Sequence, residues 1–106
     1  MAVNFPPLKE SLVPVAASHL TGEDEAILKN WSEKKASFAT VYDASMLNEI
    51  LILVNVSREH GHIDFDQVKA CLSIQASTIL YMAHCHGIDW VAFSREGTEI
   101  EGMETF

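Results

Sequence analysis

The spacing of hydrophobic residues changes along the chain, and each change predicts a different element. Apolar residues from Leu12 to Ala17 flank Pro14 and predict a strand. Because proline removes a backbone donor from the ladder, this strand should lie at a sheet edge or bulge at Pro14. Residues 38–43 and 49–56 predict two more strands, joined as a β-hairpin. Ile50–Val54 is apolar at every position, so we expect a central strand covered on both faces.

Helical spacing follows a start signal at Thr21. Its hydroxyl can accept from the amide three residues on, and Asp24 occupies the acidic position of a capping box. Ile27, Leu28 and Trp31 then form an apolar stripe along one helix face. The acids flanking Asp24 lie at the positive end of the helix dipole, so we interpret them as structural.

A second start signal lies at Asp64, with Gln67 at the capping-box position. Helical spacing continues over residues 65–86, and Gly87 is a plausible stop. One continuous helix would be about 33 Å long, which is long for so small a domain. Ser73 is itself a suitable N-cap, so we favour two helices with a break there, although one helix is not excluded.

The closing segment predicts a strand over Trp90–Phe93, a turn at Glu96–Gly97, and a short return strand over Thr98–Glu101. The predicted fold class is α+β: a mixed or antiparallel sheet of about four to five strands with two or three helices packed on it. Residues 12–106 should form this single domain. Residues 1–11, with their paired prolines, should form an extended N-terminal arm.

The composition agrees with one folded domain, because 48% of the 106 residues are apolar. The N-terminus has no secretory pattern, and the longest apolar run is far below the roughly 20 residues that span a membrane. Cys71 and Cys85 are too few for a disulfide framework and lack metal-type spacing. We therefore expect buried, reduced thiols and a cytoplasmic location.

The net charge of −8 repels phosphate backbones, which argues against direct nucleic-acid binding and favours a partner with a basic surface. Acidic residues crowd the closing segment at Glu96, Glu99, Glu101 and Glu104. Glu99 and Glu101 would share the exposed face of the return strand. Such an edge is either a solvated surface or a contact for a basic partner, and a homodimer through an edge strand stays open.

The densest group of candidate metal ligands is His60, His62 and Asp64, which alternate onto one side of an extended loop. Together they could hold zinc or nickel, although Asp64 is equally a helix cap. Ser18 and His19 lack the strained turn that activates a nucleophile, and we place them in the turn before the first helix. No phosphate loop, dinucleotide fingerprint or zinc-protease motif occurs, so no cofactor is expected and an enzyme is unsupported.

Several short motifs resemble a family of uncharacterised bacterial proteins carried on plasmids and other mobile elements. Its members have a Ser-x-His-Leu-Thr-like step and a closing Gly-x-Asp-Tyr/Trp-φ-φ-Phe-Asp-x-Asp-Gly…Gly-Leu-Pro-x-Phe segment, where φ is apolar. The matching residues are Ser18-His19-Leu20-Thr21, Gly87-Ile88-Asp89-Trp90-Val91-Ala92-Phe93, Gly97, Ile100, Gly102, Met103 and Phe106.

The resemblance extends over residues 12–106, but its specific motifs lie near the two ends. Ser94-Arg95-Glu96-Gly97 replaces the family's Asp-x-Asp-Gly, which weakens any shared metal function of that acidic pair. Glu104 stands where the family has proline. The resemblance implies a mobile-element context and carries no activity.

These observations predict a small acidic protein-binding factor from a mobile genetic element. Its role would be to inhibit a host defence system, as anti-CRISPR proteins do, or to assist a toxin–antitoxin pair. One alternative is a small metal-dependent enzyme that uses His60, His62 and Asp64. A second is a nucleic-acid mimic that acts through the acidic C-terminal edge.

Overall fold

The computed structural model describes residues 11–34, 39–46, 49–58, 61–103 and 105. Within these ranges the chain forms a four-stranded sheet, three α-helices and one 3-10 turn. In chain order the elements are β1 (Leu12–Ala16), the 3-10 turn η1 (Ala17–His19), α1 (Gly22–Lys34), β2 (Val41–Asp43), β3 (Leu51–Asn55), α2 (Phe65–Cys71), α3 (Ile74–Cys85) and β4 (Trp90–Ser94). The predicted α+β class is confirmed. The predicted N-terminal arm lies outside the described residues, except for Ser11.

The sheet is mixed, with strand order β1-β4-β3-β2. β1 runs parallel to β4, whereas β4–β3 and β3–β2 are antiparallel. As Pro14 predicted, β1 is an edge strand, and β3 lies in the interior of the sheet beside β4. The hairpin of β2 and β3 is also confirmed, with Val41 opposite Val54.

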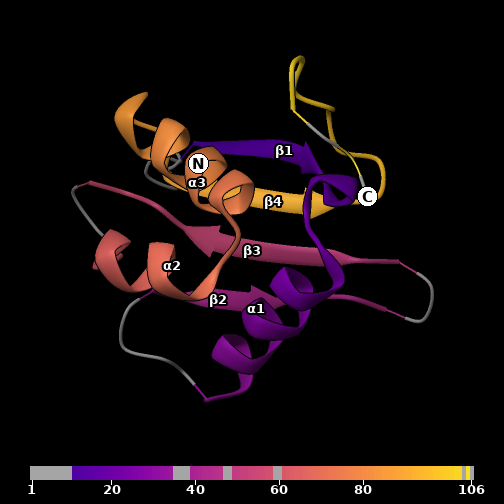
Figure 1. Cartoon of the computed structure of the whole chain (residues 1–106), viewed down its shortest axis with the longest axis horizontal. Coiled ribbons are helices and arrows are strands. Elements are labelled where there is room, and N and C mark those ends of the chain that lie inside the picture. Colours follow the sequence, from indigo (N-terminus) through magenta and orange to yellow (C-terminus); the bar gives the residue numbers. More distant parts are fainter. Residues whose placement is uncertain (1–10, 35–38, 47–48, 59–60, 104, 106) are drawn as a thin grey trace, which may run out of the picture.

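All three α-helices lie in front of the sheet in Figure 1. The sheet side chains that join the core come from alternate positions of each strand, because successive side chains point to opposite faces. They are Val13, Val15, Val41, Ile52, Val54, Val91 and Phe93. The helices contribute to the same core, among others through Leu28 and Trp31 of α1 and through Val68, Ile79 and Leu80 of α2 and α3.

The expectation that β3 is covered on both faces is wrong. Ile52 and Val54 are fully buried, but Leu51 and Leu53 on the other face keep part of their surface exposed. The described helices all pack on one side of the sheet, so only the inner face receives a full layer. The continuous apolar run reflects an outer face that is itself apolar.

The helix starts follow the predicted capping signals. At α1, the Asp24 amide donates to Thr21 Oγ1 at 3.0 Å, and the Thr21 amide donates to Asp24 Oδ2 at 3.1 Å. The helical stretch after Asp64 is divided in two, as we favoured. α2 ends at Cys71, and Ser73 caps α3 by accepting from the Ala76 amide at 3.2 Å.

The predicted return strand over Thr98–Glu101 does not form. Instead Thr98 makes one isolated bridge to Val15, and the Ala16 amide donates to the Thr98 carbonyl at 2.9 Å. Gly97 lies against this edge so closely that a Cβ atom would collide with the backbone of Val15. Residues 97–103, here called the strap, therefore run along the outer edge of β1 and do not pair with β4.

Cys71 and Cys85 are free and exposed, so the expected burial of both thiols is wrong. Each closes the last turn of its helix on a side that faces away from the core. Among the described helices, none combines the length and the apolar character needed to cross a membrane.

Candidate functional site

The acidic residues predicted as a partner site lie on the turn after β4 and on the strap. Glu96, Glu99 and Glu101 are exposed, and Glu104 lies outside the described residues. Because the strap is not a strand, Glu99 and Glu101 do not share a strand face, which corrects that expectation. Their contact with a partner stays a prediction.

The predicted metal ligands are only partly placed. His60 lies outside the described residues, and His62 and Asp64 are exposed. Asp64 Oδ1 accepts from the Asp66 amide at 3.1 Å and from the Gln67 amide at 3.4 Å, which confirms its role as the N-cap of α2. Within the described ranges, no three His, Cys, Asp or Glu side chains are grouped to hold a metal ion.

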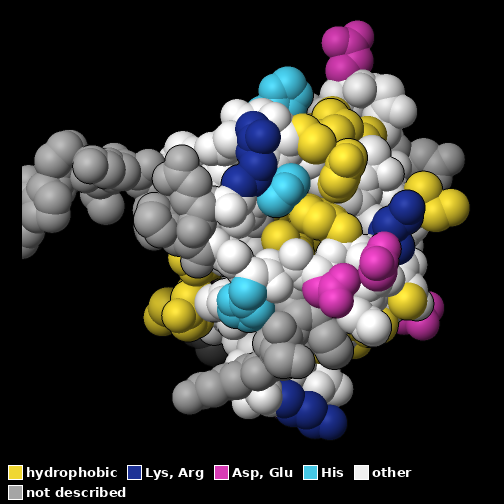
Figure 2. Space-filling model, turned by 90° about the vertical axis from the view of Figure 1, so that its left-hand side faces the viewer, with side chains coloured by type: hydrophobic (Ala, Val, Ile, Leu, Met, Phe, Trp, Pro, Cys, Tyr) yellow, Lys and Arg dark blue, Asp and Glu magenta, His cyan; other side chains and the backbone are white. Residues whose placement is uncertain are grey.

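A groove of about 390 Å³ opens between α2 and α3, the two helices that precede and follow the break at Ser73. Its walls are Phe65, Asp66 and Lys69 from α2, and Ile74, Ser77, Thr78 and Tyr81 from α3. Ile74 is 88% exposed and Tyr81 is 54% exposed, which is unusual for side chains this large and apolar. Figure 2 shows hydrophobic side chains gathered on this side of the molecule, with charged and histidine side chains around them.

Three rings hold one end of the groove in place. The Phe65 ring lies edge-on to Tyr81, with centroids 5.2 Å apart, and at 5.0 Å from His84. His84 is fixed in turn, because its Nδ1 lies 2.8 Å from the Val56 carbonyl oxygen. Such edge-on pairs contribute about 0.5–1.5 kcal/mol beyond their buried area, so this wall is preformed.

The hydroxyl groups along the groove are already occupied by helix carbonyls. Thr78 Oγ1 donates to the Ile74 carbonyl at 2.7 Å, and Ser77 Oγ donates to the Val68 carbonyl at 3.4 Å. The Tyr81 hydroxyl interacts with the Cys85 thiol, and this hydrogen bond raises the pKa of Tyr81 above its ordinary 10.0. Tyr81 therefore stays neutral at physiological pH, and the polar specificity of the groove rests with the side chains of Asp66 and Lys69.

The outer face of the sheet is a second, mostly apolar face, on which Ala16, Asn55 and Ala92 are buried. Its positions follow from the strand register and carry no charge: Leu12, Pro14, Ala16, Tyr42, Leu51, Leu53, Asn55, Trp90, Ala92 and Ser94. The Tyr42 and Trp90 rings lie 5.7 Å apart across β3. These strand positions offer no charged side chain to orient a partner.

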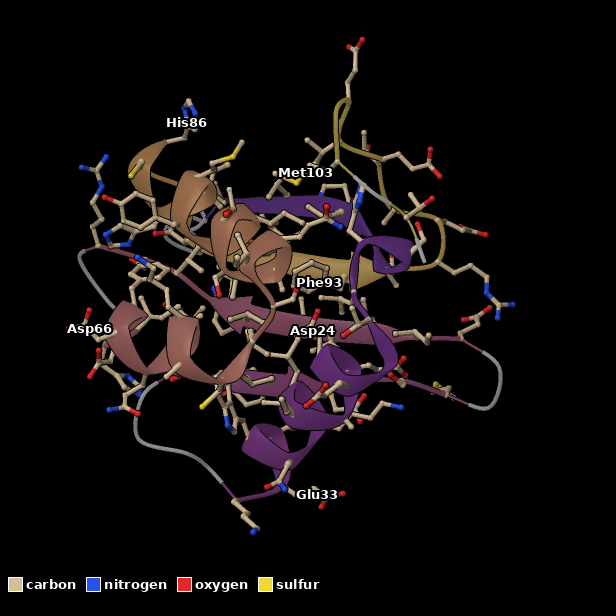
Figure 3. The ribbon with its side chains drawn as sticks, viewed as in Figure 1. Asp24, Glu33, Asp66, His86, Phe93 and Met103 are labelled. Atoms are coloured by element: carbon tan, nitrogen blue, oxygen red, sulfur yellow. The ribbon has the colours of Figure 1, made fainter. Side chains whose placement is uncertain are left out.

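The start of α3 is tied to the start of α1 through Asp24. The Ser73 amide donates to Asp24 Oδ1 at 2.8 Å, and Ser73 Oγ donates to Oδ2 at 2.7 Å. Burial would raise the pKa of Asp24, but these bonds and those from Thr21 outweigh it, so the pKa lies below the ordinary 3.8. Figure 3 shows Asp24 between the two helix starts, where it fixes the angle at which α3 leaves the break.

Comparison of the chain with family models, with curated proteins and with solved structures found no match. The resemblance to mobile-element proteins stays a prediction.

Sequence reasoning did not find the groove, although it placed the break that creates it. Phe65, Ile74 and Tyr81 all lie within residues 65–86, where the sequence predicted helix but did not separate an exposed apolar wall from the buried stripe. The available signal was Ile74 directly after the N-cap Ser73, where an apolar residue in the first turn falls outside the stripe formed by Ala76, Ile79, Leu80 and Ala83.

Proposed function

We propose that this protein is a binding factor for another protein, and that the groove between α2 and α3 receives the partner. The observation that carries the proposal is the exposed apolar wall of Phe65, Ile74 and Tyr81, bordered by the charged side chains of Asp66 and Lys69. Exposed apolar patches rimmed by polar groups are typical of protein-binding surfaces.

The partner should present a short amphipathic helix with a basic surface. A groove between two helices accepts aliphatic or aromatic anchors from such a segment. The net charge of −8 attracts basic chains during encounter, and Asp64 and Asp66 at the start of α2 place acidic groups beside the groove. Lys69 then favours a partner that also carries one acid near its anchors.

The biological setting is part of the same proposal. Exposed thiols at Cys71 and Cys85 suit a cytoplasmic protein, where reductants keep them free. The resemblance to mobile-element proteins suggests host-defence proteins and toxins as the classes of partner.

The experiment is a photo-crosslinking capture followed by measurements on purified proteins. A photoreactive residue at position 81 identifies partners in a bacterial lysate, and each candidate is then purified and titrated. We expect Ile74→Glu to weaken binding at least about tenfold, because it places a charge on an apolar anchor site. Met46→Glu is the matched control, since Met46 is 71% exposed but lies in the loop between β2 and β3.

Equal binding by the Ile74→Glu variant and the wild type would exclude the groove. A parallel titration uses the double variant Glu99→Gln, Glu101→Gln. If that variant loses binding while Ile74→Glu keeps it, and 0.5 M salt abolishes binding by the wild type, the acidic strap is the contact and the nucleic-acid mimic is supported. Circular dichroism of each variant verifies that the fold is kept.

A further inference from the structure

His19 is a buried histidine whose hydrogen bonding fixes its charge. Its side chain is fully buried in the turn that follows β1. The Ile100 amide lies 2.8 Å from His19 Nε2 and donates to it. An amide can only donate, so Nε2 carries a lone pair and the ring is neutral with its proton on Nδ1.

The residue that His19 binds belongs to the strap. Two backbone groups tie the strap to the turn and strand before it: the Thr98 carbonyl accepts from Ala16, and the Ile100 amide donates to His19. Ile100 and Met103 also pack their side chains against the core.

Beneath the strap lies an apolar groove of about 180 Å³ between β1 and α3. Its lining includes Val13, Val15, Ile79, Met82 and Ile88, and Thr98 and Ile100 of the strap close one side. The strap therefore covers apolar surface that its departure would open to solvent.

We propose that the strap is an acid-sensitive cover, held closed by neutral His19 and opened when His19 takes up a proton. An imidazolium has an N–H at both ring nitrogens, so it cannot accept from the Ile100 amide. Protonation in the closed state would also leave a charge away from water. Opening removes both costs, so a protonated His19 favours the open strap over the closed one.

Charged residues are also present on the elements around His19. They are Asp24 at the start of α1, Arg95 and Glu96 in the turn after β4, and Glu99 and Glu101 on the strap. Four of these five are carboxylates, and a carboxylate near the ring would stabilise an imidazolium in the closed state. These groups therefore oppose opening, and the loss of the Ile100 hydrogen bond together with burial of the charge is what favours it. From α3, the uncharged Gln75 contacts His19 by donating to its backbone carbonyl at 3.1 Å.

His84 provides an internal contrast. Its Nδ1 meets a carbonyl oxygen, that of Val56, at 2.8 Å. A carbonyl accepts from a ring N–H in both charge states, so protonation of His84 leaves its bond in place. Of these two histidines, His19 is therefore the one expected to control the strap.

The test is amide hydrogen exchange of the full chain, followed by NMR at pH 7.5 and pH 5 and corrected for intrinsic exchange. We expect the protection of the Ile100 amide to fall about tenfold or more at pH 5, which corresponds to one lost hydrogen bond. His19→Gln should abolish this change, because a glutamine oxygen can replace Nε2 as acceptor without titrating. His84→Gln should keep the wild-type response.

Gly97→Ala supplies the reference for an open strap, since its Cβ would collide with Val15 at every pH. Its Ile100 amide should be weakly protected at both pH values. Unchanged protection in the wild type, or an equal loss in His19→Gln, would overturn the proposal. If His19→Gln does not fold, the wild type still decides: the Ile100 amide shift must follow the same titration curve as the His19 ring protons.

Discussion

Asp24 illustrates how one side chain can serve two elements. It accepts from Thr21 in the capping box of its own helix and from Ser73 at the start of α3, so a single buried carboxylate also satisfies the groups of a residue 49 positions away. The groove proposed as the binding site depends on the angle between α2 and α3. Asp24 therefore supports the site without lining it.

Asp24→Asn should destabilise the protein by about 2 kcal/mol at pH 7, because it weakens charge-assisted hydrogen bonds in a buried position. The pKa of Asp24 is lowered in the folded state, so its contribution is complete above 3.8 and is lost as the pH falls through the folded value. The difference in the free energy of unfolding between wild type and variant, measured with urea, should therefore become smaller toward pH 2.5.

Asp66→Asn is the control for that measurement, since Asp66 is exposed in the first turn of α2. It should shift stability by less than about 0.5 kcal/mol. If the loss of unfolding free energy in Asp24→Asn stays constant from pH 7 to pH 2.5, the role given to the charged carboxylate is contradicted.

At the level of elements, the strands show that an apolar run does not imply two covered faces. β3 alternates between fully buried Ile52 and Val54 and partly exposed Leu51 and Leu53. The same alternation in β2 leaves Tyr42 56% exposed beside buried Val41. The inner and outer faces of the sheet should therefore respond differently to polar substitution.

Val54→Thr should destabilise the protein by about 2 kcal/mol, because threonine has the shape of valine but buries a hydroxyl that has no hydrogen-bond partner provided for it. Tyr42→Thr should cost less than about 1 kcal/mol, since threonine keeps strand propensity at an exposed site. Thermal unfolding followed by circular dichroism measures both. Equal losses would mean that the outer face is as tightly packed as the inner one.

For the whole molecule, the important contact joins the first strand to the last. β1 pairs with β4 over five residues, and the Ser11 amide donates to Asp89 Oδ2 at 2.8 Å. β1 joins the sheet through β4, and β4 pairs on its other side with β3. The helical layer and the sheet should consequently unfold as one cooperative unit.

The two tryptophans can test this cooperativity, because Trp31 lies in the helical layer and Trp90 in β4. In Trp90→Phe the fluorescence of Trp31 follows the helical layer, and in Trp31→Phe that of Trp90 follows the sheet. Within each variant, the urea midpoint from fluorescence should coincide with the midpoint from far-UV circular dichroism. Separate midpoints would show that the layers unfold independently.

Local interactions are what the sequence by itself determined. Capping at Thr21, Asp64 and Ser73 depends on side chains that reach amides within three residues, so their positions could be predicted with the helix starts. Pro14 indicated an edge strand for the same reason, because the missing donor is a property of the residue. The hairpin of β2 and β3 and the α+β class follow from short connections and from changes in hydrophobic period.

Contacts between distant segments were decided only by the tertiary structure. The strap passes along β1 because Gly97 allows close backbone approach and because Ile100 finds an acceptor in His19, 81 residues earlier. Which face of the sheet receives the helices likewise cannot be read from β3, since both of its faces are apolar. The groove arises in the same way: the break at Ser73 was foreseen, but whether Ile74 and Tyr81 would be buried depended on where the other elements packed.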